Sequence, residues 1–146
     1  MIQTHTYTEI KSQPLAWQNA LDVSRAQASA LKTLTDRYDQ VIFTGCGSTY
    51  YLSLAGAALF QELNGKTSRA VPASELLLNP SSVMVKGQRY LLVAVSRSGT
   101  TSETVKAVEN FKRDGRGEVI VISNYDTALS HLGDLNVIIP AGQERS

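Results

Sequence analysis

Five short apolar runs, each separated from the next by a segment with helical spacing or turn residues, constrain the fold of this chain more than any other feature. The run at 89–96 is apolar at consecutive positions, which predicts a strand that is covered on both faces. Strands that alternate with helices are typical of domains with a parallel sheet. We therefore expect an α/β fold with one open, doubly wound, five-stranded parallel sheet flanked by helices. The runs are QVIFTG (40–45), SRAVP (68–72), RYLLVAVS (89–96), EVIVIS (118–123) and NVIIP (136–140).

The segments between these runs predict the helices and the division of the chain. Pro14 suits the first turn of a long helix before the first strand, so residues 1–35 are expected to form an N-terminal helical region and residues 36–146 the sheet domain. Residues 49–63 predict a helix after the first strand. The side chains of this helix that are spaced to face the sheet are Tyr51, Ala55, Ala58 and Leu59.

Composition excludes several classes of protein. The chain has 146 residues, of which 42% are hydrophobic, enough for one core. Its 14 basic and 13 acidic residues leave a net charge of +1, so no overall field recruits nucleic acid or an acidic membrane. The first residues lack the charged start and apolar stretch of a signal peptide, and no apolar run approaches the ~20 residues that span a bilayer. We expect a soluble, cytoplasmic protein without nucleic-acid or membrane partners.

The loop after the third run, SRSGTT (96–101), has the residues of an anion site. Gly99 can adopt a backbone conformation that turns successive N–H groups inward, and the following helix N-terminus adds unpaired donors and a favourable dipole. The hydroxyls of Ser96, Ser98 and Thr101 supply further donors, and Arg97 either pairs with the anion or stays in solvent. We expect this loop to bind a phosphate monoester. The alternative is a turn that only caps the helix, and Thr100 and Glu103 have the spacing of a capping box.

The loop after the first run, GCGST (45–49), resembles the opening of a dinucleotide-binding loop, and a later segment resembles the end of a P-loop, but neither motif is complete. Tyr50 stands where a dinucleotide-binding loop has its third glycine, and no acidic residue ends the second strand to hold a ribose. The GKT at 65–67 lacks the first glycine of a P-loop, because Phe60 occupies that position. We therefore predict that Gly47, Ser48 and Thr49 bind a polar ligand other than a nucleotide.

The cysteine and histidine content argues against a metal or thiol chemistry. Cys46 is the only cysteine, and the two histidines have no metalloprotease spacing, so no metal or other cofactor is predicted. Neither histidine is placed by a motif to activate Cys46 as a nucleophile. We interpret Cys46 as a small buried thiol.

These residues resemble the SIS (sugar isomerase) domain family along the whole chain. In that family the domain is a flavodoxin-like three-layer α/β/α fold, and we expect the same here. The relatives that the sequence is most similar to are the isomerase half of glucosamine-fructose-6-phosphate aminotransferase, tagatose-6-phosphate isomerase and hexosamine-6-phosphate deaminase. The segments that carry the resemblance are EIKSQP (9–14), GCGSTYY (45–51), VPASE (71–75), SRSGTTSET (96–104), ISN (122–124) and AGQERS (141–146).

The resemblance implies roles for both loops. It assigns Ser96, Arg97, Ser98 and Thr101 to the phosphate of a sugar and Thr49, beside Ser48, to the sugar itself. Arg97 replaces a glutamine that is common in the aminotransferases, and Thr100 replaces their usual glutamate, so the identity of the sugar stays open. The residues expected to bind substrate are Gly47, Ser48, Thr49, Ser96, Arg97, Ser98, Gly99 and Thr101.

The expected activity is an aldose–ketose isomerase or a hexosamine-6-phosphate deaminase, and the alternative is a non-catalytic sensor of sugar phosphates. Proton transfer through an enediol needs a general base. Glu75 and Glu103 are better explained as structural residues, which leaves Glu144 as the candidate in this chain. The resemblance implies that a second SIS domain, in the same chain or in another subunit, supplies the catalytic glutamate and histidine. This chain alone is therefore expected to have little activity, and the family suggests a homodimer or a larger assembly.

Overall fold

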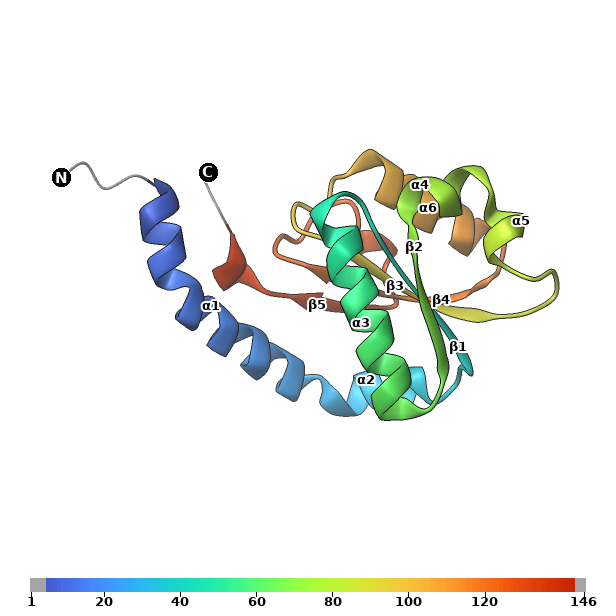
Figure 1. The fold of residues 1–146 in the computed structure, drawn as a ribbon, viewed down its shortest axis with the longest axis horizontal. Helices are drawn as coiled ribbons and strands as arrows, with labels where there is room; N and C mark the ends of the chain where they lie inside the picture. The colour runs from blue at the N-terminus through green and yellow to red at the C-terminus, as the bar shows by residue number, and fades with distance from the viewer. Residues whose placement is uncertain (1–4, 144–146) are drawn as a thin grey trace.

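The sheet observed in the computed structural model, which describes residues 5–143, has the predicted architecture (Figure 1). All strand pairs are parallel, and the order across the sheet is β2-β1-β3-β4-β5. The ends of the strands differ from the predicted ends by at most two residues. The predicted doubly wound, five-stranded α/β fold is confirmed. The strands are β1 (Gln40–Gly45), β2 (Thr67–Pro72), β3 (Tyr90–Ser96), β4 (Gly117–Ser123) and β5 (Leu135–Ile138).

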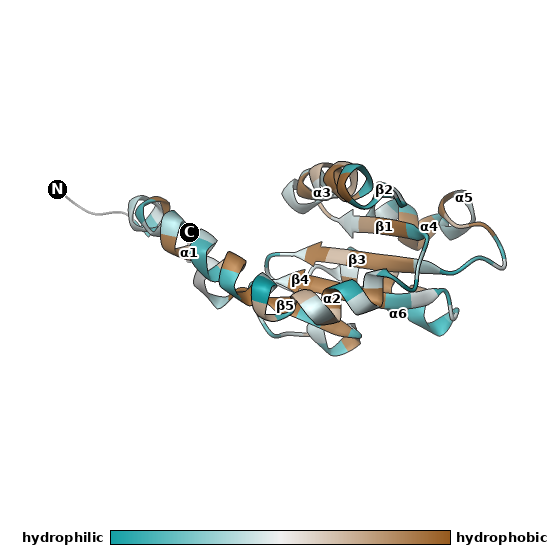
Figure 2. Cartoon of the chain, turned by 90° about the horizontal axis from the view of Figure 1, so that it is seen from below, coloured by the Kyte–Doolittle hydropathy of each residue, from teal (hydrophilic) through white to brown (hydrophobic). Residues whose placement is uncertain are grey.

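Helices cover both faces of the sheet, and the central strand β3 alternates between the two cores. Leu91 and Val93 belong to the core on one face, and Leu92 and Ala94 to the core on the other. Figure 2 shows α3 and α6 on opposite sides of the strands. One face is covered by α2 (Ala28–Thr35) and α3 (Ser48–Asn64), and the other by α4 (Ala73–Leu78), α5 (Pro80–Val83), α6 (Ser102–Arg113) and the 3₁₀ turn η1 (Ser130–Leu132).

Helix α6 starts one residue later than the capping box predicts. Its N-cap is Thr101, and Glu103 is therefore the second residue of the helix rather than the third. The Thr100 hydroxyl donates to the Ser98 Oγ at 3.1 Å instead of capping the helix. The predicted capping box is wrong, because Thr100 is part of the loop and not of the helix boundary.

Helix α3 turns a different face to the sheet from the one predicted. Ser53 and Ala57 are buried against the sheet, whereas the four residues predicted to face it are all exposed. Gly56 explains this orientation, because a Cβ atom there would lie 3.3 Å from the ring of Phe43 on β1. The helix approaches the strands closely through its small residues, and its large apolar side chains point outward. The four exposed residues are Tyr51, Ala55, Ala58 and Leu59.

The N-terminal helix α1 (His5–Ala26) also differs from the prediction. It is already helical nine residues before Pro14, which lies inside the helix rather than in its first turn. None of its residues, all of which the structure describes, is buried. The helix extends away from the sheet (Figure 1), and α2 connects it to the first strand, β1.

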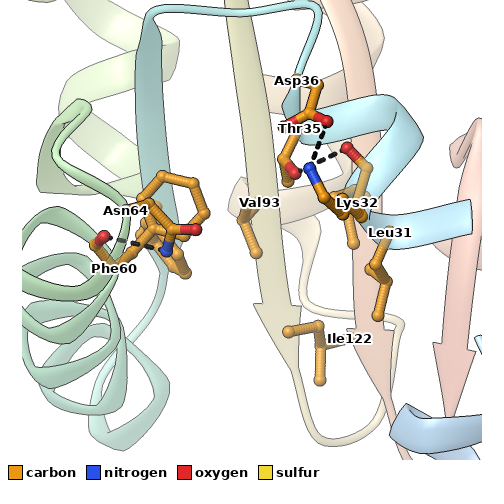
Figure 3. Close-up of a pocket in the computed structure, with 10 residues that line it drawn as sticks. Leu31, Lys32, Thr35, Asp36, Phe60, Asn64, Val93 and Ile122 are labelled. Atoms are coloured by element: carbon orange, nitrogen blue, oxygen red, sulfur yellow. Dashed lines mark hydrogen bonds and ion pairs between the residues drawn. The ribbon is translucent and has the colours of Figure 1, made fainter. Parts of the chain in front are cut away.

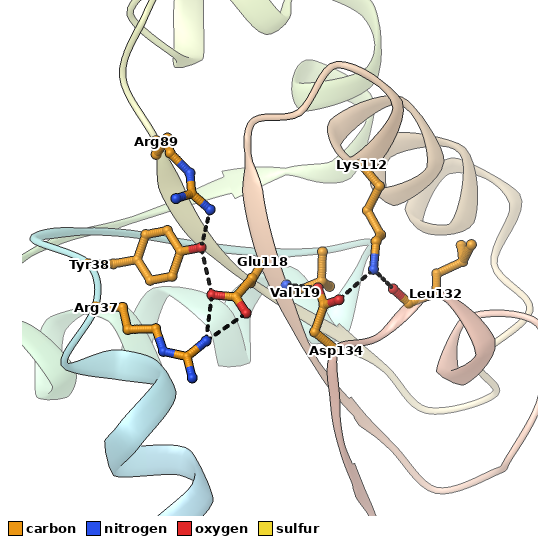
Figure 4. A network of polar contacts seen from close by, with 8 residues as sticks. All are labelled: Arg37, Tyr38, Arg89, Lys112, Glu118, Val119, Leu132 and Asp134. Carbon is orange, nitrogen blue, oxygen red and sulfur yellow. Dashed lines mark hydrogen bonds and ion pairs between the residues drawn. The ribbon is translucent and has the colours of Figure 1, made fainter.

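A polar network holds the amino ends of the strands together (Figure 4). Glu118 on β4 accepts hydrogen bonds from Arg37 at 3.0 Å and from the Tyr38 hydroxyl at 2.8 Å, and Arg89 donates to the same hydroxyl at 3.1 Å. Burial, and then the hydrogen bond to Glu118, raise the pKa of Tyr38 above its ordinary value. This network lies at the opposite end of the sheet from the loops with the predicted site residues, so it contributes to the fold and not to the site.

The carboxyl ends of β1 and β3 mark the topological switch point of the sheet. From β1 the chain crosses over through α3 to the outer strand β2, whereas from β3 it crosses through α6 on the other face to β4. Connections that leave neighbouring strands toward opposite faces leave a crevice between them. The loops 45–49 and 96–101 follow these two strands and therefore meet at this crevice.

Candidate functional site

A hollow of about 260 Å³ lies between the two loops and brings most of the predicted residues together. Gly47 and Gly99, the two glycines among the predicted residues, do not line it. Their φ angles of +54° and +66° instead shape the backbone of each loop. The hollow is lined by Cys46, Ser48, Thr49, Ser96, Arg97, Ser98 and Thr101.

Gly99 determines the shape of the loop after β3. Its N–H donates to the Ser96 Oγ at 3.1 Å, so the buried Ser96 closes the turn from within. A Cβ atom at Gly99 would lie 2.2 Å from the Thr127 Oγ1 and 3.1 Å from the Ser123 Oγ. Glycine is therefore required both by its positive φ and by the close approach of the neighbouring segment.

The segment that follows β4 holds this loop in place. The Thr127 hydroxyl donates to the Ser98 carbonyl at 3.0 Å, and the Leu129 N–H donates to the Gly99 carbonyl at 3.0 Å. The Asn124 N–H donates to the Arg97 carbonyl at 3.1 Å. The carbonyls of Arg97, Ser98 and Gly99 therefore bind this segment, and the groups of the loop that remain to bind a ligand are N–H groups and side-chain hydroxyls. The sequence prediction missed this supporting segment, whose signal is the polar run SNYDT (123–127) after the fourth strand.

The loop after β1 is held by Thr49. The Thr49 Oγ1 accepts from the Cys46 N–H at 3.0 Å and donates to the Cys46 carbonyl at 2.9 Å. Its single hydroxyl proton is therefore already used within the loop, which leaves an acceptor rather than a donor toward the hollow. Ser48 differs, because its exposed hydroxyl has no hydrogen-bond partner among residues 5–143.

The hydroxyls after β3 divide between the loop and the hollow. The Ser98 Oγ accepts from the Thr100 N–H at 3.3 Å and from the Thr100 hydroxyl, which leaves its own proton to donate. The Thr101 Oγ1 lies 3.5 Å from the Ser96 Oγ and makes no capping bond within the described chain. Arg97 is exposed at the edge of the hollow and adds a positive charge.

A second hollow, of about 390 Å³, lies beside the first and shares Cys46 with it. It lies between the start of α3 and the start of α6, and Tyr51 and Glu103 line it. The Glu75 carboxylate accepts a hydrogen bond from the Ser82 hydroxyl at 2.9 Å, so it holds the α4–α5 turn together rather than lining this hollow. Glu144, the candidate base, lies outside the described residues.

A larger apolar hollow, of about 430 Å³, lies on the α2–α3 face of the sheet and contains none of the predicted site residues (Figure 3). Phe60 and Val93 line it, and Lys32 binds Asp36 at 2.6 Å on its rim. The hydrogen bond from Lys32 lowers the pKa of Asp36. This hollow lacks the convergent donors of the site between the loops, so we assign it no part in that site.

The remaining chemistry-bearing groups are consistent with a site built from hydroxyls and backbone. Cys46 is half-buried, and its Sγ accepts from the Thr104 hydroxyl at 3.6 Å. Within the described range 5–143, no three His, Cys, Asp or Glu side chains lie where they could hold a metal ion. Over the same range, no helix is both long and apolar enough to cross a membrane.

The chain is similar to proteins of one family. The model of the SIS domain matches residues 34–146. A D-galactosamine-6-phosphate deaminase of Escherichia coli is 33% identical over 111 residues, which cover 73% of this chain and 29% of the relative. A glutamine–fructose-6-phosphate aminotransferase of Thermococcus kodakarensis is 28% identical over 136 residues, which cover 93% of this chain and 22% of the relative.

A solved structure agrees with these relatives. The tagatose-6-phosphate ketose/aldose isomerase of Escherichia coli superposes with a TM-score of 0.83 at 26% identity, over 95% of this chain and 41% of that one. This chain therefore spans less than half the length of each of these three proteins. The part that they share with it includes both loops of the site.

Proposed function

This chain belongs to the SIS domain family, and we propose that the hollow between its two loops binds the phosphate of a hexose or hexosamine 6-phosphate. We further propose that the chain is the phosphosugar-binding part of an aldose–ketose isomerase or a deaminase. Relatives named as a ketose/aldose isomerase and a galactosamine-6-phosphate deaminase support this class of activity. These relatives are named for a hexosamine phosphate and for a hexose phosphate, so the proposal covers both kinds of sugar.

The observation that carries the proposal is the convergence of hydroxyls from two loops on one hollow at the switch point of the sheet. A phosphate monoester needs several donors at close range and a compensating positive potential. Ser48, Ser98 and Thr101 supply hydroxyl donors, and the N-terminus of α6 supplies unpaired N–H groups with a positive dipole. Arg97 adds the one formal positive charge in the lining and is proposed to pair with the phosphate.

Thr49 has a different role in this proposal from the donors. Because its proton is held by the Cys46 carbonyl, it positions the loop and accepts from a sugar hydroxyl rather than donating to the phosphate. Gly47 and Gly99 likewise act through the backbone that they shape. We therefore propose that the hydroxyls of Ser48, Ser98 and Thr101 donate to the phosphate, and that the Thr49 hydroxyl accepts from the sugar.

The phosphate anchor contributes to catalysis by holding the reacting carbons in register, so that remote binding energy serves the chemical step. Moving a carbonyl between C1 and C2 also needs a general base. The described hollow contains no carboxylate or imidazole in its lining. We propose that the base is Glu144 or belongs to a second SIS domain, with residues 36–146 as the first such domain after a helical region at residues 1–35.

This assignment sets the expected partners and location. The partners are a phosphorylated hexose or amino sugar and a second SIS domain, in the same chain or in another subunit. A phosphorylated metabolite as substrate is consistent with a cytoplasmic protein. A homodimer or larger assembly is part of the same proposal.

The test is a titration of the purified chain with glucosamine 6-phosphate, fructose 6-phosphate and inorganic phosphate by isothermal calorimetry, with unphosphorylated glucosamine as the blank. We expect both sugar phosphates and phosphate to bind and the blank not to. Thr101→Ala removes a donor to a charged group, so we expect the dissociation constants of all three ligands to rise by about tenfold or more. Ser81→Ala, an exposed hydroxyl on α5, is the matched control and leaves binding unchanged.

Two results separate the alternatives. Equal affinities in Thr101→Ala and Ser81→Ala would remove the hollow from the binding site and with it the proposal. Binding with no isomerisation or ammonia release, also after a second SIS domain is supplied, would favour the sugar-phosphate sensor. Normal turnover by residues 1–146 alone would contradict the need for a second domain.

A further inference from the structure

Asn124, directly after β4, binds two parts of the chain that are far apart in the sequence. Its backbone N–H donates to the Arg97 carbonyl in the loop after β3 at 3.1 Å. Its side-chain Nδ2 donates to the Gly142 carbonyl in the 3₁₀ turn η2 (Pro140–Gly142). Its own carbonyl accepts from the Gln143 side chain at 3.0 Å. One residue therefore connects the loop of the proposed phosphate site to η2.

Gly142 makes this side-chain contact possible. A Cβ atom at position 142 would lie 2.5 Å from the Asn124 Nδ2 and 3.0 Å from the Asn124 Cγ. Any larger residue there would push the amide away from the carbonyl that it binds, since glycine alone lets another group approach the backbone this closely. The amide and the turn therefore fit each other only while position 142 has no side chain.

The turn η2 is held to β4 and its loop at both of its ends. The Ile139 N–H donates to the Ser123 carbonyl at 2.9 Å, which holds the start of the turn. Within the turn, the Gly142 N–H donates to the Ile139 carbonyl at 3.1 Å, which fixes its shape but not its position. The Asn124 amide holds the end of the turn. Helix α1 also contacts η2, so the contribution of Asn124 has to be separated from that of α1.

The bond between Asn124 and the loop is sensitive to an anion in the hollow. The Arg97 carbonyl and the Ser98 N–H belong to one peptide plane, and the described peptide bonds are all trans. In a trans peptide these two groups point in opposite directions, so the Ser98 N–H points away from Asn124. Ser98 lines the hollow. An anion that accepts from this N–H polarises the peptide and strengthens the bond at its carbonyl, so an occupied hollow holds Asn124 more tightly.

We propose that Asn124 is a positioning residue that couples the phosphate site to η2, so that a bound phosphate fixes the place from which the chain continues into Glu144. This inference rests on the proposed function, with Glu144 or a second SIS domain that follows it as the source of the base. The position of a base matters, because a displacement of about 1 Å can slow a reaction about 100-fold. The coupling is reciprocal, so a fixed turn also favours phosphate binding.

Two variants at position 124 and one elsewhere isolate the side-chain bond. Asn124→Ala removes the donor to Gly142 without adding charge and leaves the backbone bonds in place. Asn124→Asp keeps the size of the side chain, but an ionised carboxylate has no proton to donate. Asn64→Ala is the matched control, because the Asn64 amide makes the same kind of bond, to the Phe60 carbonyl at 3.0 Å. Asn64 lies at the end of α3, and the site lies at its start.

The test is an NMR titration of the chain with inorganic phosphate, in which the glycine carbonyls carry ¹³C. A carbonyl shift responds to the hydrogen bonds that the carbonyl accepts, so Gly99 reports on the loop, Gly142 on η2 and Gly65, after α3, on the background. In wild type and Asn64→Ala, we expect Gly99 and Gly142 to shift along one binding curve and Gly65 to stay. In both Asn124 variants, saturating phosphate is expected to shift Gly99 but no longer Gly142. Asn124→Ala is expected to raise the dissociation constant by about two- to fivefold, because the coupling is reciprocal.

Three results would overturn the coupling, and they separate it from the proposed function. A wild-type Gly142 carbonyl that ignores phosphate while Gly99 responds would leave the phosphate site intact and remove the coupling. A Gly142 response that persists in both Asn124 variants would mean that the Ile139 bond or α1 carries it instead. No response of Gly99 in wild type would overturn the phosphate site itself, and the inference with it.

Discussion

Helices α3 and α6 cover opposite faces of the same sheet but differ in how their sequences encode their orientation. On α6 the buried residues form one stripe, and most of the other residues are charged. The buried residues are Thr104, Ala107, Val108 and Phe111. On α3 the residues are mostly apolar or small, and its larger polar residues Gln61, Glu62 and Asn64 all lie in the last turn. An amphipathic pattern identifies the buried face only where the other face is polar. The comparison teaches that hydrophobic periodicity predicts the buried side of α6 but does not distinguish the buried side of α3 from its exposed side.

The largest effect expected from this comparison is on stability. Phe111 is 2% exposed in the core under α6. Phe111→Ala leaves a cavity there, so we expect the free energy of unfolding to fall by about 3–5 kcal/mol. Leu59 on α3 is 56% exposed, and Leu59→Ala is expected to change the free energy of unfolding by about 0.5 kcal/mol or less. Urea denaturation measures the free energy of unfolding of both variants. Similar losses would mean that the exposed side of α3 contributes as much to stability as the buried side of α6.

A pair of neighbouring alanines tests which side of α3 faces the sheet. Ala57 is 4% exposed, and the next residue, Ala58, is exposed. Ala57→Leu overfills the contact with the sheet, and we expect a loss of about 1–3 kcal/mol. Ala58→Leu is expected to leave the free energy of unfolding within about 0.5 kcal/mol of wild type. The opposite ranking in thermal or urea unfolding would restore the orientation that the sequence pattern suggested.

The same contrast explains how much the sequence predicts. The strands were predictable because apolar runs such as 89–96 need both faces covered, and the loops at 45–49 and 96–101 follow from their glycines and their place after strands. The orientation of α3 was not predictable from periodicity, because its small residues Ser53, Gly56 and Ala57 determine the contact through their size and not through hydrophobicity.

Parts of the site depend on contacts between segments far apart in the sequence, which no local pattern contains. Thr127 supports Ser98 across the loop, and this pairing follows only from the adjacency of β3 and β4. Thr49 was predicted as a contact to the sugar, and its bonds to Cys46 could not be anticipated from residue type alone. The general base stays a prediction, since Glu144 lies outside the described residues.

The starts of the two helices provide a further test. At the start of α3, the Thr49 hydroxyl makes two hydrogen bonds with Cys46, whereas at the start of α6 the Thr101 hydroxyl makes one marginal contact at 3.5 Å. We expect Thr49→Ala to lower the free energy of unfolding by about 1–2 kcal/mol and Thr101→Ala by about 0.5 kcal/mol or less. Thr49→Ser keeps the hydroxyl and should recover most of the loss. Equal costs for the two alanine variants, in the absence of ligand, would show that the Thr49 bonds do not stabilise the loop.

The smallest expected effect is on how stability depends on pH, through Tyr38. This tyrosine is buried in the core on the α3 side of the sheet. Its pKa is raised above the ordinary value of 10.0, first by burial and then by the hydrogen bond to Glu118. The folded state therefore retains a proton over a pH range in which the unfolded state has released it, so stability falls as the pH rises. The contribution is fully present below the unfolded pKa and is lost as the pH rises through the folded one. Urea denaturation at a series of pH values on either side of 10.0 measures this slope, and Tyr38→Phe should make it shallower. An unchanged slope in Tyr38→Phe would mean that other tyrosines or lysines cause the loss of stability at alkaline pH. The polar network at the amino ends of the strands would then have no part in the pH dependence.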